Sequence, residues 1–116
     1  MIVYRAMKQY VIDEIRPGER KKLKDYLDEH FCDPAMDGIF WIPIEEDLLS
    51  ETQRQHRDCQ PLYFAVELGE DALACELLVR TRQRVRCDCI AYASEKQRNW
   101  VIQVVDAIFE KIELHT

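Results

Sequence analysis

Glycine and long apolar runs are scarce in this sequence, and each scarcity excludes a class of protein. The 116 residues contain three glycines and four prolines, and no stretch resembles the glycine-rich loops that bind phosphate. The longest apolar run, residues 39–44, is far shorter than the roughly 20 residues that span a bilayer. The start of the chain lacks the apolar core and cleavage site of a signal peptide. We therefore expect no membrane partner.

Excess positive charge and a disulfide framework are missing as well. The formal net charge is −6 and the pI is about 5.1, which disfavours binding to nucleic acid through its phosphates. The five cysteines are an odd number without framework spacing. This usage favours free thiols in a reducing compartment, and we predict a cytoplasmic location.

The composition that remains is typical of a folded protein. Hydrophobic residues make up 47% of the chain and charged residues 33%, which favours a globular core over disorder. The length suits one domain covering residues 1–116. Met7 is an alternative start, and residues 1–6 would then be a loose N-terminal extension.

Residues 62–92 organise the predicted fold. Apolar and polar residues alternate in three consecutive segments, which predicts three antiparallel strands with one buried face. The short links 69–71 and 81–83 suit hairpins. One register pairs Val79 with Val85 and Leu77 with Cys87, and a register two residues away remains open. The predicted core-facing residues are Leu62, Phe64, Val66, Leu68, Leu73, Cys75, Leu77, Val79, Val85, Cys87, Cys89 and Ala91.

The segments before the predicted sheet alternate between strand and helix patterns. Residues 8–14 are predicted as a strand, although the first fifteen residues also match one helical face. Pro17 opens a helix, whose apolar stripe includes a partly buried His30. Residues 39–44 are predicted as a strand with Pro43 at its end or edge. Residues 45–47 can open a short helix, and residues 50–58 form either a solvated helical turn or a loop.

The last segment completes the fold class. Residues 94–97, Ser-Glu-Lys-Gln, match a capping box, and the helix that follows should run to about residue 113 and cover the sheet. The element order is β-α-β-(short α)-β-β-β-α. This order predicts an α+β two-layer sandwich: a mostly antiparallel sheet of four to five strands with helices packed on one face.

Cysteine is the first candidate for chemistry. The candidates for a metal or redox site are Cys59, Cys75, Cys87 and Cys89, with His56 nearby in sequence. A Cys-x-Cys pair in a strand lacks the tight turn that structural zinc sites use. Buried cysteine commonly packs as a small hydrophobic residue. We therefore predict core packing, with no metal and no cofactor.

Arginine is the second candidate. Four arginines recur around the predicted second hairpin: Arg80, Arg82, Arg84 and Arg86. Guanidinium groups match the geometry of carboxylate and phosphate. An acidic protein partner is the favoured ligand, and the acidic segment 45–47 of a second copy is one form of it. The alternative is a solvated hairpin tip whose charges are balanced by nearby carboxylates.

The outer face of the sheet is the third candidate. It is predicted to expose Trp41, Tyr63, Leu78, Ile90 and Tyr92. Exposed apolar and aromatic surface of this kind marks an interface or a ligand groove, and a homodimer is its simplest form. The alternative is that the N-terminal strand or residues 45–60 cover this face.

These observations rank three hypotheses. The leading one is a non-enzymatic interaction or regulatory module that uses the outer face and the arginine hairpin tip, with self-association or an acidic protein as partner. The second is a metal-binding or thiol redox-responsive protein. The third is a small-molecule enzyme with a pocket between residues 45–60 and the sheet. The three histidines are scattered, and their spacing supplies no nucleophile–base pair.

Overall fold

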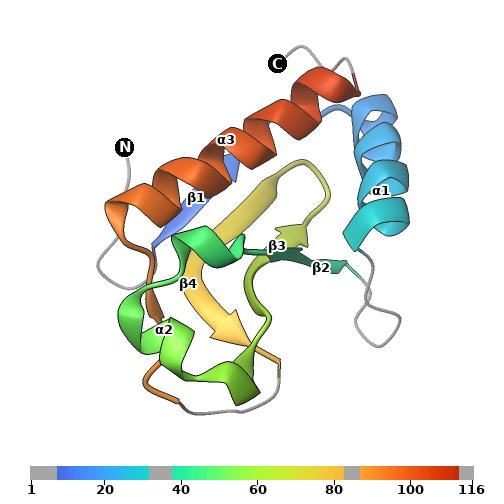
Figure 1. Cartoon of the computed structure of the whole chain (residues 1–116). Helices are drawn as coiled ribbons and strands as arrows, with labels where there is room; N and C mark the ends of the chain where they lie inside the picture. Colours follow the sequence, from blue (N-terminus) through green and yellow to red (C-terminus); the bar gives the residue numbers. More distant parts are fainter. Residues whose placement is uncertain (1–7, 32–37, 83–86, 113–116) are drawn as a thin grey trace.

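The computed structural model describes residues 8–31, 38–82 and 87–112. Its elements in chain order are β1 (Gln9–Ile12), α1 (Pro17–Phe31), β2 (Ile39–Pro43), the 3₁₀ turn η1 (Glu46–Leu48), α2 (Glu51–Gln55), the 3₁₀ turn η2 (Arg57–Cys59), β3 (Leu62–Leu68), β4 (Leu73–Thr81), β5 (Ala91–Tyr92) and α3 (Glu95–Lys111). The chain therefore has the predicted α+β fold, with an antiparallel sheet and helices (Figure 1).

The sheet has the order β1-β4-β3-β2, and β5 also pairs with β4. β1 pairs with residues 73–76 of β4, whereas β5 pairs with Leu78 and Val79. The two strands therefore share one edge of β4 and meet at Leu77, whose N–H donates to the Lys8 carbonyl and whose carbonyl accepts from Ala93 N–H. The predicted strand at residues 8–14 is confirmed, with shorter bounds.

The prediction for the third strand of residues 62–92 is wrong in length and register. Val79 pairs with Ala91 rather than Val85, and the strand begins only at Ala91. Cys87 and Ile90 instead close a turn, in which Ile90 N–H donates to the Cys87 carbonyl at 3.0 Å. The reason is that β1 occupies most of the β4 edge that the prediction gave to this strand. Val85 lies outside the described residues.

A bulge interrupts the pairing of β3 with β4. Phe64 pairs with Val79 and Val66 with Cys75, so Ala65 lies opposite residues 76–78. The inward alternation nevertheless survives on both strands, because Phe64, Val66, Cys75 and Val79 are all fully buried. On the outer face, the bulge changes which side chains of β4 are close enough to contact one another.

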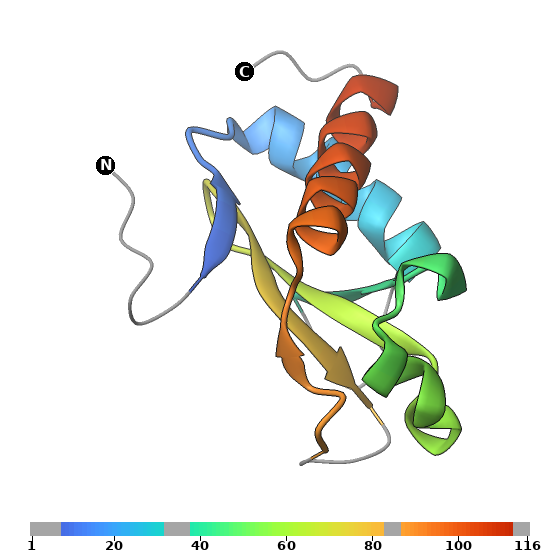
Figure 2. The same cartoon turned by 60° about the vertical axis from the view of Figure 1, so that its left-hand side comes forward.

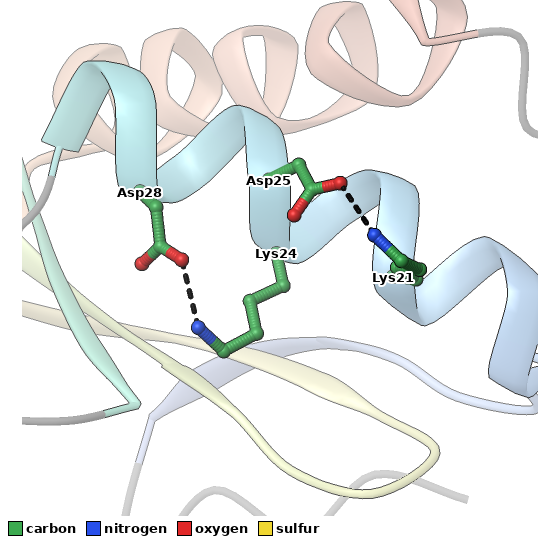
Figure 3. Close-up of polar contacts among 4 residues, drawn as sticks. All are labelled: Lys21, Lys24, Asp25 and Asp28. Carbon is green, nitrogen blue, oxygen red and sulfur yellow. Dashed lines mark hydrogen bonds and ion pairs between the residues drawn. The ribbon is translucent and has the colours of Figure 1, made fainter.

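The two long helices begin where the sequence predicts. Pro17 is the first residue of α1, and the Ser94 side chain exchanges capping-box hydrogen bonds with Gln97 at the start of α3. On the solvent side of α1, Lys21 pairs with Asp25 at 3.2 Å and Lys24 with Asp28 at 2.7 Å (Figure 3). Such pairs, four residues apart, support an exposed helix face.

Both long helices lie on the same side of the sheet, together with the segment from η1 to η2 (Figures 1 and 2). α1 contributes Leu23 and Leu27 to the core, and α3 contributes Val101, Val105, Ile108 and Phe109. On α1, His30 is exposed rather than partly buried, because its ring lies outside the core and stacks on Tyr26 with centroids 4.2 Å apart. α2 confirms the helical-turn alternative for residues 50–58.

None of the helices in the described ranges combines the length and the apolar character that crossing a bilayer requires. The opposite face of the sheet carries the outward residues of the five strands, and no described helix lies over it (Figure 2). We call it the open face. Its central residues are Val11, Trp41, Tyr63, Leu78, Arg80 and Tyr92.

Candidate functional site

Arg80 lies on the open face in a bidentate ion pair with Glu76. Its Nε and Nη2 donate to the two carboxylate oxygens of Glu76 at 2.5 and 3.2 Å. Residues four apart on a regular strand are about 13 Å apart, so the bulge in β4 makes this pair possible. The hydrogen bonds to Glu76 raise the pKa of Arg80. Arg80 thus has the carboxylate partner that the solvated-tip alternative assumed.

Arg82 joins the arginine candidate to the aromatic candidate. Its guanidinium lies 5.3 Å from the centre of the Trp41 ring and 5.8 Å from that of Tyr63. The two rings form an edge-to-face pair with centroids 6.0 Å apart. Cation–π contacts at this range are attractive, by about 0.5–1 kcal/mol at exposed sites. Arg84 and Arg86 lie outside the described residues.

The rest of the open face is apolar at its centre. Leu78 pairs with Tyr92 across β4 and β5, and the Lys8 ammonium lies 4.6 Å from the centre of the Tyr92 ring. Tyr92 is 49% exposed and Val11 is 48% exposed. Ile90 does not belong to this face. It precedes β5 and packs against the core, because the strand that should have turned it outward begins one residue later.

Charge is distributed unevenly along the open face. Lys8 and Arg82 lie at the end where β4 finishes, together with Arg80, whose charge is paired with Glu76. Exposed carboxylates gather at the opposite end, around the β3–β4 hairpin and the residues after β1: Asp13, Glu14, Glu67, Glu70 and Asp71. The face therefore has a basic end and an acidic end, separated by roughly 20 Å of strand.

A second constellation lies on the helical side of the sheet. A ring nitrogen of His56 and the Sγ atoms of Cys87 and Cys89 all lie within 4.8 Å of one another. The Sγ of Cys59 is 3.4 Å from that of Cys87. Cys59 and Cys89 are buried and Cys87 is half-buried. One imidazole and three thiols thus converge from two segments that are far apart in sequence, and we call them the His–Cys cluster.

The thiols of the His–Cys cluster differ in acidity. A hydrogen bond from the Cys89 backbone N–H, assisted by the Cys89 thiol, lowers the pKa of Cys87. Burial, followed by contacts with the neighbouring sulfurs, raises the pKa of Cys89 to about 12. The Nδ1 atom of His56 is buried and has no hydrogen-bond partner within residues 8–31, 38–82 and 87–112. An unsatisfied buried nitrogen is uncommon in a folded protein.

Buried hydrogen bonds hold both turns that carry the cluster. The Gln53 side chain donates to the Cys89 carbonyl at 3.0 Å, and the Thr81 hydroxyl donates to the Cys59 carbonyl at 2.6 Å. Gln97 of α3 donates in turn to the Gln53 amide oxygen at 2.9 Å. The cluster is therefore fixed by α2, β4 and α3 together, although sequence reasoning treated residues 50–58 as solvated.

The sequence-predicted cysteine set is divided by the fold. Cys75 lies in the core on β4, where burial raises the pKa of its thiol to about 12. His56 joins Cys59, Cys87 and Cys89 instead. The premise that Cys87 and Cys89 lie in a strand is wrong, because they lie in a turn. The spacings His-x₂-Cys and Cys-x-Cys were the signals that could have identified the four residues together.

A depression also exists where the enzyme hypothesis expected one. It has a volume of about 390 Å³ and is lined by Ile44, Glu46, Leu49, Gln60, Pro61 and Leu62. Glu46 is the single ionisable side chain in that lining. A carboxylate without a partner acid, base or nucleophile gives weak support for catalysis.

Comparisons with protein-family models, with curated proteins and with solved structures return no match for this chain. The proposals that follow therefore rest on the geometry of its own residues.

Proposed function

We propose that the chain is a non-enzymatic interaction module of the cytoplasm that self-associates through its open face. The observation that carries the proposal is the Arg82 guanidinium over the Trp41 and Tyr63 rings, on a sheet face that bears no described helix. Arginine and aromatic residues are enriched where proteins bind proteins. The free state of the four described cysteines supports a reducing compartment.

Charge complementarity favours a second copy as the partner. A two-fold axis that lies in the plane of contact and perpendicular to the strands stacks two open faces antiparallel, so that the basic end of one lies against the acidic end of the other. The Arg82 end would then face the exposed Glu67 and Asp71 of its partner. The exposed apolar side chains Val11 and Tyr92 become buried in the same contact.

The oligomeric state as a function of concentration tests the proposal. Sedimentation equilibrium of the full chain should reveal a dimer whose dissociation constant rises with salt, because the contact is partly ionic. Arg82→Glu should weaken the dimer at least tenfold, or about 1.4 kcal/mol. Arg98→Glu is the matched control, since it makes the same charge change at an exposed position of α3, on the helical side of the sheet.

A charge exchange tests the antiparallel arrangement. The double variant Arg82→Glu with Glu67→Arg should regain part of the lost affinity. Each copy then places a positive side chain at position 67 opposite a negative side chain at position 82 of its partner. Failure to regain any affinity would contradict the arrangement. A wild-type protein that stays monomeric at every concentration would overturn self-association, and binding of an acidic peptide by that monomer would assign the face to a different protein.

A further inference from the structure

We propose that His56, Cys59, Cys87 and Cys89 form a structural site for a zinc ion. This site is separate from the open face, so neither proposal depends on the other. Three sulfurs and one imidazole nitrogen are the donor set that Zn²⁺ takes in closed, four-coordinate structural sites.

The spacing of the ligand atoms suits one ion. A tetrahedral zinc with bonds of about 2.3 Å to sulfur sets its ligand atoms about 3.8 Å apart. The Cys59 and Cys87 sulfurs are 3.4 Å apart, and the His56, Cys87 and Cys89 ligand atoms lie within 4.8 Å of one another. These separations are close to those that one tetrahedral ion requires.

The local backbone supplies each pair of ligands from a tight turn. η2 joins His56 to Cys59, and Cys59 N–H donates to the His56 carbonyl at 3.0 Å. The hydrogen bond from Ile90 N–H to the Cys87 carbonyl closes the turn that holds Cys87 and Cys89. Short turns that each supply two ligands are typical of structural zinc sites, although the Cys-x-Cys spacing of Cys87 and Cys89 is one residue shorter than the usual Cys-x₂-Cys.

The unsatisfied nitrogen of His56 is an independent indication of a ligand. Its Nδ1 is buried and has no hydrogen-bond partner among the residues that the structure describes. A metal bond would satisfy this atom. Binding would release the protons of the three thiols and keep the imidazole neutral, and the resulting thiolate–zinc centre would carry one negative charge.

Residues around the cluster behave as supports for such a site. Gln53 and Thr81 hold the backbone carbonyls of Cys89 and Cys59 through buried hydrogen bonds. Hydrogen bonds of this kind fix the orientation of metal ligands. The half-buried Cys87 leaves an entry path for the ion. In this role, zinc would fasten the segment from α2 to η2 to the turn that precedes β5.

Metal analysis of the full chain, purified without a histidine tag and under reducing conditions, tests the site. The wild-type protein should contain one zinc ion per chain. His56→Gln and Cys87→Ser should each lower zinc affinity at least tenfold. His30→Gln is the matched control, because it changes an exposed histidine on α1, and it should retain the metal. Both ligand variants leave the fully buried Cys89 unchanged, so the core packing around it is kept. Circular dichroism then verifies that each variant is folded.

Two further measurements separate zinc binding from other roles of the thiols. Co²⁺ added to the metal-free protein should produce the visible absorption of a tetrahedral thiolate centre, and a chelator should lower the thermal midpoint of the wild type by more than that of His56→Gln. A wild-type protein without zinc and without the cobalt spectrum would overturn the proposal. A zinc affinity that is unchanged in both ligand variants would overturn it as well, and so would a Cys59–Cys87 disulfide that persists under reducing conditions.

Discussion

Gln53 lies within the polar stretch 50–58, yet its side chain is almost fully buried, with 3% exposed. Its amide donates to the Cys89 carbonyl and accepts from the Gln97 side chain. A buried amide of this kind is stable because its donor and its acceptor are both satisfied. Its energetic role is therefore set by its partners and not by the polarity of the surrounding sequence.

Replacing Gln53 with leucine should destabilise the protein by about 2–3 kcal/mol, because the change removes the buried donor to the Cys89 carbonyl and one of the two acceptors of the Gln97 amide, which keeps only the Leu48 carbonyl. Urea denaturation followed by circular dichroism measures the free energy of unfolding. Gln55→Leu, at an exposed position on the same helix, should change that free energy by less than about 0.5 kcal/mol. Equal effects of the two changes would contradict the role given to Gln53.

At the scale of elements, β1 depends on contacts with both β4 and α3. It has four residues and lies at an edge of the sheet, so its own pairing gives it little stability. The Tyr10 hydroxyl donates to the Asp106 carboxylate at 2.6 Å, which ties the strand to α3. Burial, together with this hydrogen bond, raises the pKa of Tyr10 to about 12.

The raised pKa of Tyr10 makes part of the stability depend on pH. Folding favours the neutral phenol, so its contribution is fully present below pH 10 and is lost as the pH rises through about 12. Tyr10→Phe should therefore cost about 0.5–1 kcal/mol near pH 8. The difference from the wild type should shrink between pH 10 and 12.

Denaturation curves across that pH range measure the change. Tyr26→Phe makes the same chemical substitution on α1 and controls for the general loss of a phenol. If the difference in unfolding free energy between Tyr10→Phe and the wild type stayed constant up to pH 12, the hydrogen bond to Asp106 would not contribute to stability.

At the scale of the whole molecule, one core joins nearly every element. Its buried residues extend from Ile15, before α1, to Phe109, near the end of α3. α3 contacts the sheet through Trp100, whose ring centroid lies 6.4 Å from that of Phe64. A core shared in this way should unfold cooperatively.

Cys75 reports on that cooperativity, because it is fully buried on β4, a central strand of the sheet. In zinc-free protein, alkylation of Cys75 should require global unfolding, and its rate should follow the urea dependence of that transition. Cys87, which is half-buried, should react under native conditions. Mass spectrometry of the two peptides measures both rates. Rapid labelling of Cys75 without urea would disprove cooperative protection.

The sequence by itself determined the features that depend on residues close together in the chain. Alternation predicted the buried sides of β3 and β4, the Ser94–Gln97 capping box predicted the start of α3, and Pro17 predicted the start of α1. These features follow from the local periods of strands and helices and from hydrogen bonds between near neighbours. They were sufficient to give the fold class.

Only the tertiary structure decided which distant segments meet. Alternation around Cys87 and Cys89 has the same appearance in a strand as in a turn whose thiols face a buried cluster, so pattern alone could not place them. Cys59 and Cys87 are 28 residues apart, and β1 occupies the β4 edge along which the predicted strand would have carried Cys87 away from Cys59. Arg82 likewise meets Trp41 only because β2 pairs with β3. Long-range pairing fixes such contacts, because the alternation within one strand specifies its buried face but not which strand it pairs with.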